Sequence, residues 1–475
     1  MKEIFEKLEA AVTDIFLFLM FSVYLFGVSP EGYENISETK YLLFCILCGG
    51  YCGIMLILLL QKTVLCRAEI SGSRWKQISW RDRGERPRIC FTLFLFLYLA
   101  LTAVSGVVSE YGAATLTGEA RREGVLTISI YGFVCFFVMK SYRGRHRNVL
   151  CVFAAASVLL FDVICLLQLL NRNPLGLYPG DFTYADRYRE YGGAFLGTTG
   201  NADLTSAFLS LMIPFFAVIF LRSQKKRSPA SVLYAAAACF SAVILVWSGV
   251  LAGIAGTAVS LIVFLPAAPG MNRKKSLGWY GAAMLLVALS LTSVYFFPSD
   301  DGAGSGEDGN AAVRQVEELQ QALHGDLSDS AGSGRIHIYR QVWHLIEEKP
   351  FLGGGPDTLI FRETEAFRRY DSSRGKYIEA YIDTAHSEYL NIFVCQGLFA
   401  LAAYLGALAC GFFTAVRNRR RLWPAACEAA VFSYAVQACF GFSMYITAPY
   451  FWIFLGFLMT REEYGKRGNT EINGL

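Results

Sequence analysis

The chain is largely a succession of apolar runs, each long enough to cross a lipid bilayer, and this feature most limits how it can fold. A membrane-spanning helix needs about 20 mainly apolar residues, and the runs supply about 15 to 22 each. Of the 475 residues, 54% are hydrophobic and only 17% are charged, which is unlike a soluble domain. The runs lie near residues 11–28, 41–60, 91–108, 124–140, 149–170, 204–222, 231–247, 249–266, 279–297, 386–408, 424–443 and 447–460. The sequence therefore predicts an all-α polytopic membrane protein with about twelve transmembrane helices.

Basic residues concentrate in alternate connections between these runs. They gather at residues 62–88, 140–147, 222–227, 273–275, 417–421 and 461–467. By the positive-inside rule these segments are cytoplasmic, and an even number of spans then places both termini on the cytoplasmic side. The first run is expected to be a retained span, because the small-residue cleavage site of a signal peptide is missing after it. The outer loops are predicted at residues 29–40, 109–123, 171–203 and 298–385.

The longest outer loop divides the chain into three parts. We expect a transmembrane bundle of nine spans at 1–297, an extracytoplasmic domain at 298–385, and three further spans with a cytoplasmic tail at 386–475. Within the loop, apolar residues recur at helical spacing over 311–324 and again over 335–348. Both segments are predicted to be amphipathic helices that lie on the membrane or on the bundle.

The second of these helices carries an arginine among apolar residues. The expected apolar face consists of Ile336, Ile338, Tyr339, Val342, Trp343, Leu345 and Ile346, and Arg335 falls near its middle. An arginine that faces inward must meet an anion or carbonyl oxygens, although snorkelling from the start of the helix is the alternative. Arg340 falls on the polar face, where a solvated surface residue and a substrate contact are both open.

The loop also holds a glycine turn and ends at a histidine. Lys349-Pro350 is expected to end the helix, and Gly353-Gly-Gly355 then forms a sharp turn. Its backbone N–H groups either approach a ligand or serve a plain connector. His386 stands where the chain re-enters an apolar run, at the boundary between water and lipid.

Other polar and small residues have structural interpretations beside functional ones. The thirteen cysteines fall in apolar runs or cytoplasmic segments and need no disulfide partners. Gly49 with Gly53, and Gly249 with Gly253 and Gly256, have the spacing of close helix contacts in lipid. Asp162, inside the fifth run, is either functional or hydrogen-bonded to a neighbouring helix. The net charge of +4 gives no reason to expect a nucleic-acid partner.

Three sequence blocks, in this order and all on the predicted outer face, resemble a known family. They are Gly197-Thr-Thr-Gly-Asn-Ala-Asp-Leu204; Arg335 with Trp343, followed by Pro350-Phe-Leu-Gly-Gly-Gly-Pro356; and His386-Ser-Glu-Tyr-Leu-Asn391. The pattern resembles the O-antigen ligase and O-antigen polymerase family of polytopic membrane glycosyltransferases. The likeness spans about residues 190 to 460 and implies a GT-C-like fold with one large external loop. The family usually has an arginine where this chain has Phe195, and Arg187 and Arg189 are the nearest substitutes.

The resemblance implies that a glycan is transferred from undecaprenyl pyrophosphate to a hydroxyl of a lipid, glycan or protein acceptor. The reaction would take place at the outer face of the cytoplasmic membrane of a bacterium, with no cofactor and no required metal. His386 is then the general base, and Arg335 the first ligand of the pyrophosphate. The residues expected to bind substrate are Arg187, Arg189, Asn201, Asp203, Arg340 and Glu388.

Asn201 and Asp203 are also ordinary helix caps, so a structural role stays open for them. Ligase and polymerase share donor and chemistry, and the sequence leaves both open. The alternative from another class is a transporter or flippase of lipid-linked sugars. Transporters place polar groups at mid-membrane between repeated halves, whereas here the polar residues cluster outside the membrane and the sequence has no visible repeat.

Overall fold

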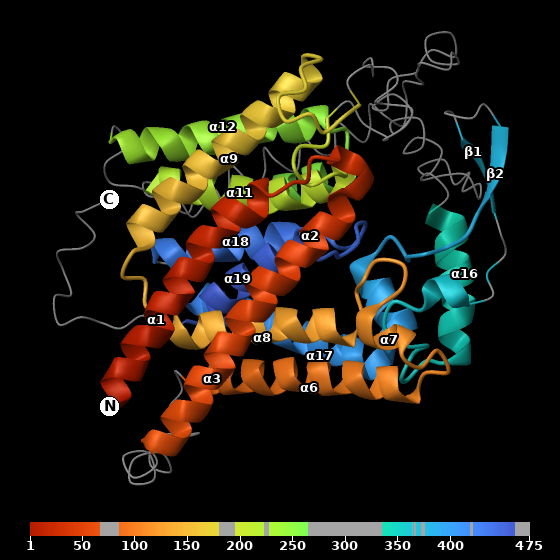
Figure 1. Ribbon diagram of the computed structural model, residues 1–475, viewed down its shortest axis with the longest axis horizontal. Coiled ribbons are helices and arrows are strands. Elements are labelled where there is room, and N and C mark those ends of the chain that lie inside the picture. Colours follow the sequence, from red (N-terminus) through yellow and green to blue (C-terminus); the bar gives the residue numbers. More distant parts are fainter. Residues whose placement is uncertain are drawn as a thin grey trace, which may run out of the picture.

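A computed structural model describes residues 1–66, 85–179, 195–222, 228–264, 335–362, 364, 367–371, 376–418 and 421–460, and these form a long bundle of helices (Figure 1). The expected span 279–297 and the expected helix 311–324 lie outside the described residues. Eleven of the twelve predicted spans coincide with helical segments: α1 (Lys2–Leu19) extended by η1 (Met20–Tyr24); α2 (Ile36–Phe44), η3 (Cys45–Gly49) and α3 (Gly50–Leu65); α6 (Arg86–Val108); α8 (Val125–Ser141); α9 (Arg147–Leu169); α11 (Ala202–Arg222); α12 (Pro229–Trp247); α13 (Leu251–Phe264); α17 (Glu388–Asn418); α18 (Leu422–Gln437); and α19 (Ala448–Leu458).

The helices have the length and composition of a membrane protein. Six of the described helical stretches are long and apolar enough to cross a bilayer: Gly32–Leu65, Arg86–Val108, Arg147–Leu169, Ala202–Leu221, Pro229–Trp247 and Glu388–Val416. Val125–Ser141, Leu251–Phe264 and Ala448–Leu458 are apolar but shorter. The predicted helical membrane bundle is thus confirmed, and the count of twelve spans stays a prediction.

In the core of the bundle, the last three described helices pack against helices from earlier in the chain. α17 packs along α6, α18 lies against α11 and α13, and α19 lies against α8. α19 is buried along its whole length, with aromatic contacts to several other helices. α18 and α19 therefore lie in the interior of the bundle, whereas α17 keeps one face exposed.

Of the two predicted sets of glycine contacts, the described residues show one, at Gly253 and Gly256. A Cβ atom at Gly253 would lie 1.9 Å from Ser206 Oγ, and one at Gly256 would lie 2.4 Å from the carbonyl oxygen of Ser433. α13 therefore needs these glycines to approach its neighbours. The prediction for Gly49 and Gly53 is wrong, because a Cβ at Gly53 would meet nothing within 4 Å and one at Gly49 would make ordinary contact.

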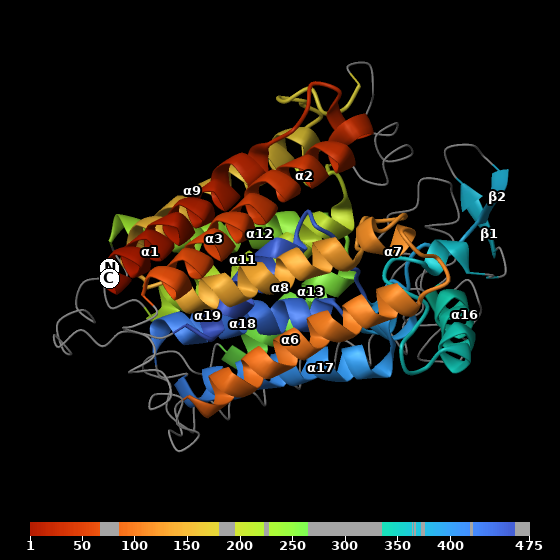
Figure 2. The ribbon, with the colours of Figure 1, turned by 60° about the horizontal axis from the view of Figure 1, so that its bottom comes forward.

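Where the structure describes them, loops predicted on opposite sides of the membrane lie at opposite ends of the bundle. At one end, Lys62 lies 3.0 Å from Glu9 and His146 lies 2.7 Å from Asp14. At the other end, Arg122 lies 2.6 Å from Glu38. Figure 2 shows the start of α1 at the first end, and α7 (Ala114–Thr117), α16 (Arg335–Glu348) and the strands at the second. The alternation of loops read from charge therefore matches the packing.

The loop domain contains one element that the all-α prediction missed. β1 (Phe367–Asp371) and β2 (Lys376–Ala380) pair antiparallel, with Phe367 opposite Ala380 and Asp371 opposite Lys376. The residues of this hairpin lack the regular apolar and polar alternation that marks a half-buried strand, so no pattern in the sequence predicted it. η5 (Leu359–Phe361) is a single turn of 3-10 helix that precedes this hairpin.

Candidate functional site

His386 is held in a fixed turn just before α17. Its φ is 47°, a left-handed conformation that is uncommon for residues other than glycine. Asn391 Oδ1 accepts a hydrogen bond from the backbone N–H of Ala385 at 3.2 Å, and the N–H of Glu388 donates to the carbonyl of Ala438 at 2.9 Å. The turn is thus tied both to α17 and to the end of α18. Strained backbone that its surroundings enforce is often found at functional sites.

The surroundings of the His386 ring keep it neutral. The side chain is half-buried and meets the Phe442 ring edge to face at 6.0 Å between centroids. Burial lowers the pKa of His386, and the positive charges of Arg121 and Arg335 lower it further, against the opposing effect of Asp383 and Asp203. A neutral imidazole at neutral pH can accept a proton.

Arg121, which the sequence analysis did not single out, belongs to the same group. Its guanidinium donates to Asp383 Oδ2, from Nη2 at 2.8 Å and from Nε at 3.1 Å. The same guanidinium lies over the Phe442 ring, 4.0 Å from the centroid. Arg121 and His386 therefore share one aromatic ring as neighbour. A signal existed, because Arg121 and Arg122 are basic residues in a short outer loop, against the positive-inside bias.

Arg335 lies at the start of α16 and acts on the same histidine. It is half-buried and contributes to the depressed pKa of His386. The predicted apolar face of α16 is largely correct, since Ile338, Val342, Leu345 and Ile346 are buried in one cluster with the start of α17. The prediction is wrong for Trp343, because its side chain is 51% exposed and its indole N–H donates to Glu347 at 2.9 Å.

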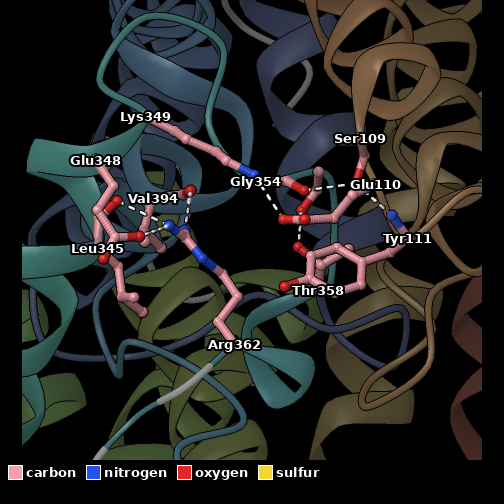
Figure 3. Close-up of polar contacts among 11 residues, drawn as sticks. Ser109, Glu110, Tyr111, Leu345, Glu348, Lys349, Gly354, Thr358, Arg362 and Val394 are labelled. Carbon is pink, nitrogen blue, oxygen red and sulfur yellow. Dashed lines mark hydrogen bonds and ion pairs between the residues drawn. The ribbon is translucent and has the colours of Figure 1, made fainter.

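A buried arginine fastens the other end of α16 to the bundle (Figure 3). The Arg362 guanidinium donates to the carbonyl of Leu345 at 2.8 Å and to the carbonyl of Val394 in α17 at 3.1 Å. The last carbonyls of a helix have no partner within it, so Arg362 satisfies one of them and joins α16 to α17. Beside it, Lys349 Nζ lies 2.6 Å from Glu110 Oε1. The helix that carries Arg335 is thus anchored at its far end.

The glycine turn is a packing device against α17. The backbone N–H groups of Gly354 and Gly355 donate to the carbonyls of Val394 and Cys395, at 3.1 and 2.7 Å. Those carbonyls lack helical partners because α17 is interrupted at Gly397, whose φ is 86°. Of the two interpretations, the connector is therefore the one that the structure supports for these N–H groups. Both N–H groups already donate hydrogen bonds to α17.

Replacing Gly397 with alanine is expected to destabilise this junction. A Cβ atom at Gly397 would lie 2.2 Å from the carbonyl oxygen of Phe351, and the positive φ adds strain. Together these effects should cost about 2 to 5 kcal/mol, which thermal unfolding in detergent would register as a lower Tm. Gly53→Ala is the control, because its Cβ would meet nothing within 4 Å. Equal melting temperatures for the two variants would contradict the packing role.

The first of the three sequence blocks, residues 197–204, supplies the cap of a helix and a charged side chain near His386. Asn201 Oδ1 accepts hydrogen bonds from the backbone N–H groups of Asp203, at 2.8 Å, and Leu204, at 3.2 Å. It is therefore the N-cap of α11, as the structural alternative held. Asp203 is near enough to His386 to raise its pKa, so this block does reach the site. Arg187 and Arg189 lie outside the described residues.

The remaining predicted residues point elsewhere. Glu388 is buried in the bundle, where its Oε1 accepts a hydrogen bond from the Tyr404 hydroxyl at 2.6 Å. Arg340 lies on the exposed side of α16. Asp162 is buried between α9 and α12 and accepts a hydrogen bond from Ser241 at 2.6 Å, which agrees with its structural interpretation. Among the described residues, no three His, Cys, Asp or Glu side chains form a group that could hold a metal ion.

Residues 236–405 match the family model of the O-antigen ligases. The match covers 170 of the 475 residues and includes Arg335 and His386, whereas Arg121 lies outside it. No curated protein matches the chain. The comparison thus shows that this part of the chain is similar to the O-antigen ligases, in agreement with the sequence blocks quoted above.

Proposed function

We propose that the protein transfers a glycan from undecaprenyl pyrophosphate to a hydroxyl group of an acceptor, at the outer face of the cytoplasmic membrane of a bacterium. One observation carries the proposal: at the end of the bundle where the predicted outer loops gather, His386 and Arg121 lie against the same Phe442 ring, and the charges of Arg121 and Arg335 help to keep His386 neutral. Neutral imidazole suits a general base, and guanidinium groups suit a diphosphate.

In the proposed reaction, the acceptor hydroxyl oxygen attacks the anomeric carbon of the lipid-linked sugar. The bond between that carbon and the diphosphate oxygen breaks, and the carrier leaves as its diphosphate. His386 takes the hydroxyl proton, while Arg121 and Arg335 stabilise the charge that grows on the diphosphate. The Arg121 guanidinium is bound to Asp383, so a diphosphate would have to replace or share this contact.

The experiment uses purified protein in proteoliposomes that contain an undecaprenyl-pyrophosphate-linked glycan. A glycolipid, a second carrier-linked glycan and a protein are supplied in turn as acceptors, and the masses of the products are measured by mass spectrometry. Glycan on a lipid or protein indicates a ligase, and lengthened glycan on the carrier indicates a polymerase. Movement of the donor across the bilayer without any product would contradict the proposal and favour a transporter.

The pH dependence of transfer should reflect the depressed pKa of His386. Burial, Arg121 and Arg335 lower this pKa below its ordinary value of about 6.5. Since the base must be neutral, kcat/KM should be constant near neutral pH and fall only below about pH 6.5. The measurement is the rate of transfer between pH 4.5 and 8.

Asp357 also titrates in this range, and a variant separates its contribution. Burial raises the pKa of Asp357 to about 6. In Asp357→Asn this carboxyl is gone, so an acid limb that persists does not come from Asp357 and agrees with titration of His386. A limb that vanishes in this variant would contradict the assignment to His386.

A further inference from the structure

The loop that carries Arg121 is closed around one buried carboxylate. Asp357, which follows the Gly-Gly-Gly-Pro turn, is 7% exposed. Its Oδ2 accepts hydrogen bonds from the backbone N–H groups of Arg121 at 2.9 Å and of Glu123 at 3.4 Å. A carboxylate that gathers backbone N–H groups in this way fixes the course of the loop, and such charge-assisted bonds are stronger than neutral ones.

The backbone of this loop comes close to the Asp357 carboxylate at a glycine. A Cβ atom at Gly118 would lie 2.5 Å from Asp357 Oδ2 and 2.7 Å from the Glu123 nitrogen, and the φ of Gly118 is 80°. A residue with a side chain there would therefore push the loop off Asp357. Asp357 itself has a φ of 56°, so it leaves the turn in a left-handed conformation that asparagine and glycine also tolerate.

One residue joins this backbone contact to the site. Arg121 is held through its N–H by Asp357, and its guanidinium reaches Asp383 and the Phe442 ring, which also borders His386. A displacement of the Arg121 backbone therefore moves a charge beside the histidine. A shift of about 1 Å in a group that positions a substrate can reduce the rate by about 100-fold.

We propose that Asp357 is a positioning residue: its carboxylate fixes the loop of residues 118–123 and thereby sets the Arg121 guanidinium beside His386 to receive the diphosphate of the donor. The proposal rests on the proposed function. It also gives a role to the glycine turn, whose hydrogen bonds to α17 place Asp357 next to the loop.

The test compares Asp357→Gly with Asp357→Asn, because both tolerate the backbone conformation and only the second keeps an oxygen acceptor. We expect Asp357→Gly to lower kcat/KM by about 10-fold to 100-fold and Asp357→Asn to stay within about threefold of the wild type. Each change is then repeated in an Arg121→Gln background. If Asp357 acts through Arg121, Asp357→Gly should there cause a further loss of no more than about twofold. An undiminished further loss in that background, or no rescue by asparagine, would overturn the proposal.

A second readout does not depend on activity. Trypsin cleaves after Arg121 and Arg122, so the rate of cleavage in this loop reports how firmly it is held. We expect faster cleavage in Asp357→Gly than in the wild type and Asp357→Asn, in protein of unchanged Tm. An equal rate in all three would overturn the positioning role even if transfer occurs. Failure of the wild type to transfer any glycan, with faster cleavage in Asp357→Gly, would instead count against the proposed function.

Discussion

His386→Asn is expected to lower the rate of glycan transfer by about 100-fold to 10,000-fold, the usual contribution of a general base. Asparagine is the informative replacement because the φ of residue 386 is 47°, which asparagine tolerates better than alanine does. The turn, its ties to Asn391 and Ala438, and the fold should therefore remain, while the proton acceptor is lost. The measurement is kcat for transfer from the carrier-linked donor, with Tm as the check on folding.

The matched control is His344→Asn. His344 lies on the exposed side of α16, 3.7 Å from Glu347, and no role in the site is assigned to it. Its replacement should leave transfer at the rate of the wild type. Full activity in His386→Asn would exclude His386 as the base and would mean that another group accepts the proton.

Arg121→Gln is expected to lower kcat/KM by about 10-fold to 150-fold, which corresponds to the loss of about 1.5 to 3 kcal/mol from a hydrogen bond to a charged group. Glutamine keeps much of the length of the side chain and removes the charge. Arg121→Lys should recover part of the loss, because it restores the charge without the planar, two-pronged donor. The effect should appear as a raised KM for the carrier-linked donor and should weaken as salt is added.

The neighbouring residue provides the comparison. The Arg122 guanidinium lies 2.6 Å from Glu38 and over the Tyr41 ring at 4.8 Å, so it is directed at α2. Arg122→Gln removes an equal charge from the same loop and is expected to change kcat/KM by less than about threefold. Equal losses for the two variants would mean that the loop attracts the donor by its net charge alone.

The fold was largely open to prediction because a bilayer imposes a simple requirement. A spanning helix must be apolar over about 20 residues, so the runs are visible without any knowledge of packing. Exposure at the edge of an apolar face is harder to foresee, since helical periodicity cannot tell which edge meets the bundle. Trp343 lies on such an edge and is exposed.

The site was predictable only in the part that is local in sequence. His386 and Arg335 stand out by their position at the start of a span and within an apolar face. Arg121 owes its place to a contact with Asp357, 236 residues further along the chain, and no local pattern reports such a contact. The glycine turn had two interpretations for the same reason, because its partner, the interruption of α17 at Gly397, is defined only by the three-dimensional fold.

The packing of α6 along α17 has a consequence for biosynthesis. Thr102 Oγ1 donates to Gln396 Oε1 at 2.8 Å, and Ser105 Oγ donates to the carbonyl of Cys395 at 3.0 Å, so polar groups deep in α6 have their partners almost 300 residues later. While the ribosome is still translating the intervening segments, α6 must wait in lipid with these hydroxyls unmatched by α17. Arg121 is likewise synthesised long before His386, so under the proposed function the nascent chain could not act on a donor until the last helices have inserted.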